Sequence, residues 1–340
     1  MHSFSRNLRQ RAVITFTGLV LFAFASLIFS GMTGSVSIPI SDIPAALNEL
    51  LHGQQSTLAA TLLDLRLSRA VSAFATGAAL SLAGVMMQAL LRNPLADPYV
   101  LGISAGASVG ALAALLFMCA AWMVDAAAFV GAVTVAMMLY LLAKRDLRSG
   151  TAAEGGTALL LLTGAIMSSA CMALVTLMLS VAPESRLRSM VFWMIGDLSG
   201  TQVRVMPWVV LIAALAYALR IARSINVMAL HAEAAATLGI RVGALRKGLF
   251  FVSGLLTASA VTSAGSIGFV GLIVPHACRF AVGPDHRILI PAATLAGGTF
   301  LLLADTLART VIAPTQLPVG VVTALIGAPV FLYQLHRLRK

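Results

Sequence analysis

Few side chains in this chain could carry out covalent chemistry, and their spacing matches no common nucleotide-binding or catalytic pattern. The only lysines are Lys144, Lys247 and Lys340, and none of them follows a glycine. A phosphate-binding loop of the G-x-x-x-x-G-K-[ST] type needs a lysine directly after a glycine, so this motif is absent. If ATP drives this protein, a separate chain must hydrolyse it, and we do not expect the chain itself to be an enzyme.

The sequence also predicts no metal site and no cofactor. The six histidines are scattered, and the three cysteines, Cys119, Cys171 and Cys278, lie in apolar stretches without metal-ligand spacing. An enzyme within the membrane would need a nucleophile beside a base. Ser266 and His276 lie in apolar segments, but their spacing singles out neither of them.

Residues 229–248 resemble a rigid connector more than a flexible loop. The stretch from 231 to 238 is rich in alanine, a strong helix former, and Gly239 supplies a stop at its C-terminus. A second helix can begin after this glycine and run into the next apolar segment. Two short helices joined in this way make a rigid knob, which can transmit a push from a partner. Its residues of interest are His231, Glu233, Ala234, Ala235, Leu238, Gly239 and Arg241.

A second informative segment lies between two apolar runs at residues 84–106. Asn93-Pro94 and Asp97-Pro98 predict a tight turn between two helices, because proline and side chains that bond their own backbone favour turns. A purely structural hairpin is the simplest interpretation of this turn.

The composition indicates which elements must position these residues. Of 340 residues, 59% are hydrophobic and only 10% are charged, and the mean hydropathy is +0.96. Soluble domains are about 45–50% apolar and about 25% charged, so a membrane is the natural solvent. Long apolar runs without alternation indicate helices. We expect an all-α polytopic membrane protein with about ten spans, forming one domain over 1–340. The predicted spans are 13–32, 70–91, 98–118, 124–143, 157–180, 203–222, 247–265, 267–281, 288–308 and 317–335.

The basic residues predict the topology. Ten spans place both basic termini on the same side, and all but six of the 23 Lys and Arg residues then fall on that side, which the positive-inside rule assigns to the cytoplasm. The net charge of +11 therefore reflects membrane topology, and we expect no nucleic-acid partner. Arg66 and Arg69 are expected to open the second span, and Arg309 to close the ninth. The six arginines predicted outside are Arg66, Arg69, Arg186, Arg188, Arg204 and Arg309.

Four segments resemble the motifs of one family, in that family's order and spacing. They are RLSRAVSAFATGAALSLAGVMMQALLRNPLADPYVLGISAGA (66–107), GSIGFVGLIVPHACRFAVGPDHR (265–287), ADTLAR (304–309) and LPVGVVTALIGAPVFLYQL (317–335). Glu233-Ala234-Ala235 followed by Gly239 also fits the EAA---G pattern of ABC-importer permeases. The chain thus resembles the FecCD-type permeases, which import iron chelates, haem or cobalamin. Ser68 stands where the family usually has proline.

The resemblance implies an architecture and a set of partners. It implies the type II ABC importer permease fold with ten helices, a homodimer with the pore on its twofold axis, and a location in the lipid of a bacterial inner membrane with both termini cytoplasmic. Two ABC ATPase subunits would bind on the cytoplasmic side, and a periplasmic substrate-binding protein on the other. Iron chelates are the commonest cargo of the family, so the resemblance favours an iron chelate and leaves haem and cobalamin open.

The resemblance also implies roles for particular residues. Arg66, Arg69 and Arg309 would receive glutamates of the binding protein, and the knob around 229–248 would couple to the ATPases. The implied cytoplasmic gate comprises Asn93, Pro94, Leu95 and Thr157. The candidate pathway residues are Met167, Met172, Thr176 and Met178.

Simpler interpretations stay open for these residues. Arg309 could pair only with Asp305, four residues earlier on the same helix. Ordinary helix packing accounts for the methionines as well as a pathway does. An ion-coupled secondary transporter would carry carboxylates within the membrane as relays, and Asp305 is the main candidate for one.

Overall fold

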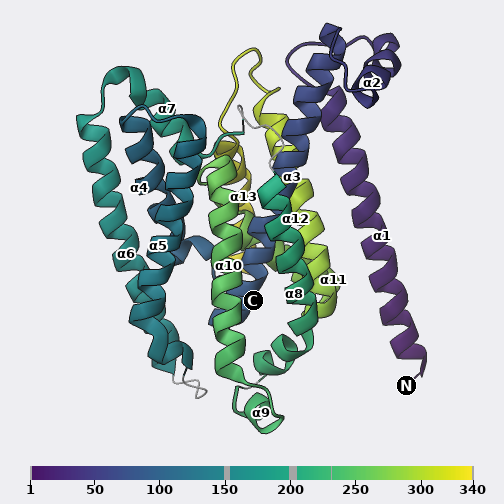
Figure 1. Cartoon of the computed structure of the whole chain (residues 1–340). Helices are drawn as coiled ribbons and strands as arrows, with labels where there is room; N and C mark the ends of the chain where they lie inside the picture. Colours follow the sequence, from purple (N-terminus) through teal and green to yellow (C-terminus); the bar gives the residue numbers. More distant parts are fainter. Residues whose placement is uncertain (1, 149–153, 199–204, 231, 339–340) are drawn as a thin grey trace.

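The computed structural model describes residues 2–148, 154–198, 205–230 and 232–338. This part of the chain is all-helical and forms one bundle (Figure 1). Its elements are α1 (His2–Met32), η1 (Ile40–Asp42), α2 (Ile43–Leu51), α3 (Leu58–Leu91), η2 (Pro98–Leu101), α4 (Ile103–Leu116), α5 (Ala121–Arg148), α6 (Glu154–Val181), α7 (Glu184–Ile195), α8 (Val205–Leu230), α9 (Ala232–Thr237), α10 (Val242–Ala264), α11 (Val270–Val282), α12 (His286–Ala308) and α13 (Val319–Leu338).

Each predicted span corresponds to a helix in the described part of the chain. The helices α1, α3, α5, α6, α8, α10 and α12 contain stretches long and apolar enough to cross a membrane, judged by length and composition. The other three spans correspond to the shorter apolar helices α4, α11 and α13. The prediction of an all-α polytopic membrane protein is therefore confirmed.

The structure corrects the start of the second span. α3 begins at Leu58, where the Thr57 side chain accepts a hydrogen bond from the Ala60 amide at 3.2 Å and caps the helix. The prediction that Arg66 and Arg69 open this helix is wrong, because both residues lie well inside it. Hydropathy identifies the apolar part of a helix that can lie in lipid. It does not show that a polar N-cap residue begins the helix several turns earlier.

α3 is the central helix of the bundle, and 83% of its most apolar stretch is buried. Glycines let α12 and α11 approach its backbone closely, as small residues do between membrane helices. A Cβ atom on Gly77 would lie 2.3 Å from the Gly297 carbonyl oxygen of α12. A Cβ atom on Gly84 would lie 1.9 Å from the Gly271 carbonyl oxygen of α11. The helix that carries Arg66 and Arg69 is thus held firmly by its neighbours.

The bundle has two ends that differ in their extra elements. α2 and α7 lie at one end, here named the α2 end, and α9 lies at the opposite end, here named the α9 end (Figure 1). α1 begins near the α9 end and runs toward the α2 end. Neither α2 nor α7 coincides with a predicted span, because both are too short to cross a membrane.

Candidate functional site

The three predicted docking arginines lie together at the α2 end, where two of them contact one carboxylate and the third contacts the end of α1. Arg69 of α3 donates from Nε and Nη2 to Asp305 of α12, at 2.9–3.0 Å. The Nε atom of Arg309 lies 3.8 Å from Oδ2 of the same carboxylate, close enough for an ion pair but not for a hydrogen bond. We call Arg66, Arg69, Arg309 and Asp305 the arginine cluster.

Two of these arginines also cap the C-terminal end of α1. Arg309 Nη2 donates to the carbonyl oxygen and to the hydroxyl of Ser30, both at 2.6 Å. Arg66 donates to the carbonyl oxygen of Met32 at 3.1 Å and to that of Val36. The last carbonyls of a helix lack partners within the helix and carry partial negative charge, so cations stabilise them. The cluster therefore joins α1, α3 and α12.

The cluster is buried in the isolated chain. The exposed fractions are 6% for Arg66, 9% for Arg69, 5% for Arg309 and 0% for Asp305. Arg69 Nη1 also donates to Gln316 Oε1 at 2.8 Å, from the segment that follows α12. The structure thus brings the three predicted arginines together and gives each of them acceptors within the chain. Their docking role stays a prediction.

The sequence did not single out Ser30 and Gln316 as partners of these arginines. Arg309 does not pair only with Asp305, because it also binds Ser30. Polar residues at the end of an apolar span are common, so no local pattern distinguishes Ser30. The one available signal was the spacing of Asp305 and Arg309, which puts them on one face of a helix.

The predicted knob at the α9 end is a short helix with a defined stop. α9 ends in a Schellman motif, in which the amide of Ile240 donates to Ala235 O and the amide of Gly239 donates to Ala236 O, both at 3.0 Å. Gly239 has a φ of +81°, a left-handed conformation that favours glycine. Gly239 thus supplies the expected stop, and α10 begins at Val242 and continues as the next span.

The knob has an inward and an outward side. Ala235 is fully buried, whereas Leu238 is 71% exposed and Arg241 is exposed at the start of α10. His231 lies outside the described residues, as do the side chains of Glu233 and Ala234. An apolar side chain held out by a capped helix is suited to contact another protein.

A polar network supports the same end of the bundle. Asn226 of α8 donates to Asp285 Oδ1 at 2.7 Å, and its own side-chain oxygen accepts from the amide of His286 at 2.9 Å. Arg287 Nη2 donates to Asp285 Oδ2 at 3.0 Å. We call Asn226, Asp285, His286 and Arg287 the Asp285 network. It fixes the last turns of α8, which lead into α9, to the start of α12.

The electrostatics of this network follow from its contacts. Partial burial raises the pKa of Asp285, but the Arg287 side chain and amide and the Asn226 side chain outweigh this effect and lower the pKa to about 2. The carboxylate is therefore ionised at neutral pH. In the sequence Asp285 stands out only as part of the 265–287 motif, and no local pattern marks Asn226 as its partner.

The predicted gate turn is present between α3 and η2. Arg92 ends α3 in the left-handed conformation, and the Asn93 side chain accepts a hydrogen bond from the Leu95 amide at 2.9 Å. Asn93 and Pro94 are exposed, and Leu95 is half-buried. The side chain of Thr157, in the first turns of α6, lies outside the described residues.

η2 connects this turn to α6. A Cβ atom on Gly164 of α6 would lie 2.7 Å from the Val100 carbonyl oxygen and 3.0 Å from the Leu101 Cα. Glycine at this position lets η2 pack directly on α6. A displacement of α6 is therefore expected to displace η2 and the turn before it.

The four candidate pathway residues do not share one face of α6. Met172 and Thr176 are exposed and lie one turn apart on the same face. Met178 packs against the hydrophobic core, and Met167 lines an apolar cavity of about 720 Å³ that α4, α5 and α6 form. The helical period of 3.6 residues places Met167 and Thr176 on opposite faces. Of the four candidate residues, only Met172 and Thr176 therefore lie on the exposed face of α6.

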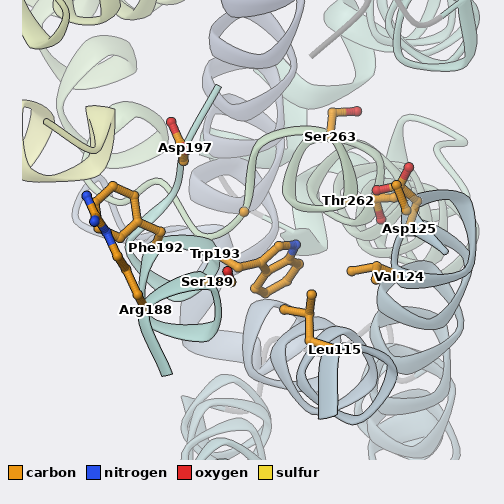
Figure 2. Close-up of a pocket in the computed structure, with 12 residues that line it drawn as sticks. Leu115, Val124, Asp125, Arg188, Ser189, Phe192, Trp193, Asp197, Thr262 and Ser263 are labelled. Atoms are coloured by element: carbon orange, nitrogen blue, oxygen red, sulfur yellow. The ribbon is translucent and has the colours of Figure 1, made fainter. Parts of the chain in front are cut away.

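A cavity of about 410 Å³ lies at the α2 end beside α7 (Figure 2). Figure 2 shows the Trp193 indole near its centre, with Asp125 and Thr262 on one side and Arg188 on the other. The Arg188 guanidinium lies 5.4 Å from the centre of the Phe192 ring. The cavity thus combines aromatic and charged surfaces. No group of three or more His, Cys, Asp or Glu side chains suited to a metal occurs among the described residues.

Comparison with known proteins places these features in a family. The model of the FecCD transport family matches residues 19–337. The cobalamin import system permease protein of Halobacterium salinarum is 42% identical over 277 residues, which cover 80% of this chain and 72% of the relative. The vitamin B12 import system permease protein of Salmonella paratyphi A is 35% identical over 340 residues and 98% of both chains.

A solved structure agrees with the same assignment. An inward-facing ABC transporter of the metal-chelate type superposes with a TM-score of 0.82 and 29% sequence identity, over 95% of this chain and 98% of its own. The family model spans most of the sequence, and the bundle matches the type II ABC importer permease fold. The chain therefore belongs to the FecCD transport family and is a multi-pass membrane permease of the ABC importer class.

Proposed function

We propose that this permease carries cobalamin across the bacterial inner membrane, inward and at the expense of ATP hydrolysed by partner subunits. The observation that carries this cargo assignment is the 35% identity over 98% of both chains with a vitamin B12 import permease. The 42% identical relative is also named for cobalamin. An iron chelate is the second candidate, because the superposing transporter is described as a metal-chelate type.

The proposed assembly is a homodimer with the pathway between two copies of α6 and α13. α6 packs on one side only, and 22% of its most apolar stretch is buried. On α6, Ile166 is 61% exposed, and on α13, Leu325 and Tyr333 are 69% and 59% exposed. A second copy would cover such apolar faces, and Met172 and Thr176 are the candidate pathway residues on the exposed side of α6. Disulfide cross-linking between copies that carry Met172→Cys tests this arrangement.

The proposed contact with two ABC ATPase subunits is the knob around α9. The capped helix and the exposed side chain of Leu238 support this role, because a rigid element transmits displacement to α8 and α10. The turn at Asn93, Pro94 and Leu95 is the proposed gate on the same side, together with Thr157. With this assignment the α9 end and both termini face the cytoplasm.

The proposed contact with a periplasmic binding protein is the α2 end, where Arg66, Arg69 and Arg309 would receive acidic side chains. Complementary charges of this kind steer and orient a partner more than they add affinity. The support is the arginine cluster at this end of the bundle, in which Arg69 and Arg309 contact Asp305 and Arg66 contacts neutral carbonyl oxygens.

Uptake into proteoliposomes tests the cargo and the energy source. The permease is reconstituted with its ATPase and binding protein, and labelled cobalamin, ferric siderophore and haem are followed with and without ATP. We expect ATP-dependent accumulation of cobalamin. Accumulation of a siderophore or haem instead would overturn the cobalamin assignment. Transport that ignores ATP and collapses with the proton gradient would overturn the ABC mechanism for this chain.

A further inference from the structure

The arginine cluster uses two kinds of acceptor, which differ in how easily a partner could replace them. Asp305 is fully buried on α12 and is held by Arg69 through both of its oxygen atoms. The other acceptors are neutral oxygens: the Ser30 hydroxyl and carbonyl, the Gly31, Met32 and Val36 carbonyls, and the Gln316 side chain. They belong to the end of α1 and to the segments that follow α1 and α12.

A carboxylate from another protein would be a stronger acceptor than any of these neutral oxygens. It carries a full negative charge, and it can accept two parallel N–H bonds from one guanidinium, which a carbonyl or hydroxyl oxygen does not offer. Asp305 neutralises one of three arginine charges by direct contact, so a partner carboxylate also meets an excess of positive charge. The neutral acceptors are therefore the ones that an acidic partner would displace.

The covering segments must move before this displacement can occur. A Cβ atom on Gly34 would lie only 2.5–2.6 Å from the Arg66 guanidinium, so the segment after α1 rests directly on that group. Gln316 is itself exposed and covers Arg69. Arginine residues exposed by 9% or less give a partner little surface to bind while these segments stay in place.

We propose that docking of an acidic protein at the α2 end is an exchange of acceptors, in which partner carboxylates replace the neutral oxygens and release the end of α1. The inference rests on the proposed docking of a binding protein at this end, and it adds the regulation of that site. Asp305 keeps its two contacts with Arg69 during the exchange and holds the arginines in position. Docking thereby frees the end of α1 to move. Only 11% of the most apolar stretch of α1 is buried, so the bundle covers little of this helix.

Two variants weaken the internal acceptors without removing a charge. Gln316→Ala removes the acceptor of Arg69 Nη1, and Ser30→Ala removes the hydroxyl acceptor of Arg309. Because each net hydrogen bond counts for about 0.5–1.5 kcal/mol, we expect each variant to bind the binding protein about two- to tenfold more tightly. Thr315→Ala, next to Gln316 on the same exposed segment, is the matched control and is expected to bind as the parent does.

A distance measurement reports the release of α1 directly. Spin labels are placed at Ser35→Cys, in the segment after α1, and at Met118→Cys, at the end of α4, after Cys119, Cys171 and Cys278 are replaced by serine. Both labelled positions are exposed. The complete transporter is reconstituted in nanodiscs, and electron double resonance is recorded with and without the binding protein. We expect the distance distribution to broaden and shift when the binding protein binds.

A charge-removal arm separates the two proposals. Arg188→Gln, at the same end but outside the arginine cluster, is the control for the loss of one charge. If Arg66→Gln binds the binding protein as tightly as this control and with the same salt dependence, the docking assignment itself fails. If docking needs Arg66 but the label distance stays constant, and Gln316→Ala and Ser30→Ala bind equally or more weakly, the arginines dock without an exchange and only the present inference is overturned.

Discussion

The two ends of the bundle each hold an arginine–aspartate pair with nearly the same contact distance, in very different surroundings. Arg69 and Asp305 are 2.9 Å apart, and their side chains are 10% and 0% exposed. Arg287 and Asp285 are 3.0 Å apart, and theirs are 57% and 34% exposed. The Coulomb energy depends on the local dielectric, so equal geometry does not mean equal energy. Removing one partner of the buried pair leaves an unpaired buried charge, whereas water compensates the exposed pair.

The pairs also differ in what they connect. Arg69 and Asp305 are separated by 236 residues and fasten α3 to α12. Asp285 and Arg287 are two residues apart, and Asn226 extends their network to α8. The α2 end is thus a buried joint between distant helices, and the α9 end is a solvated support for the knob. This contrast leads to four predictions, ordered by their expected effect on stability.

The largest difference is expected when each aspartate loses its charge. Asp305→Asn should lower the unfolding free energy by about 3–5 kcal/mol, because Arg69 and Arg309 then stay buried without a counter-ion. Asp285→Asn should cost about 1 kcal/mol or less. Unfolding of both variants in one detergent measures the difference. Equal losses would show that the surroundings do not separate the two pairs.

A backbone change should have an intermediate effect at the α9 end. Gly239→Val places a branched side chain at a φ of +81° and should cost about 1–2 kcal/mol locally. It should also lower the ATPase activity that docking stimulates in the reconstituted transporter. Gly239→Asn is the control, because asparagine tolerates the left-handed region. If valine and asparagine behave alike, the Schellman stop does not control the knob.

A smaller effect of pH is expected at the α9 end. The pKa of Asp285 is lowered from 3.8 to about 2 in the folded protein, so its stabilisation is present above pH 4 and is lost as the pH falls toward 2. Solvent screening limits the contribution to about 1 kcal/mol or less. Comparing unfolding of the parent and of Asp285→Asn between pH 5 and pH 2 isolates this contribution. A pH dependence identical in the two proteins would contradict the assignment.

The smallest effect on stability is expected at Leu238, which is 71% exposed. Leu238→Ala should change the unfolding free energy by less than about 0.5 kcal/mol, as surface substitutions usually do. If the knob contacts an ATPase, the same variant should bind the ATPase more weakly and transport more slowly. Exposed Leu51 of α2, at the other end, gives a matched Leu51→Ala control. Loss of transport in both variants alike would argue against a specific contact at Leu238.

The sequence indicated much of the fold and part of the candidate sites. Each predicted apolar segment is a helix, because burial in lipid needs an uninterrupted apolar run that hydropathy detects. Gly239 was predicted as a stop, because a left-handed cap has a local signature. The start of α3 and the presence of α2 and α7 were not predicted, because short helices outside the membrane lack that signal. The faces of α6 were not predicted either, because the sequence does not show which side of this helix packs on α4 and α5, and the pathway role of Met167, Met172, Thr176 and Met178 stays a prediction.

The sequence by itself determined that this is a membrane protein of about ten spans without a phosphate-binding loop, and it placed the chain in its family. These properties depend on composition and on motifs within single segments. Only the tertiary structure decided which acceptors the arginines meet, because Ser30, Arg69, Asp305 and Gln316 are brought together from four separate segments. The energy of a charge depends on its burial and its neighbours, and both are set by packing between helices that are distant in the sequence.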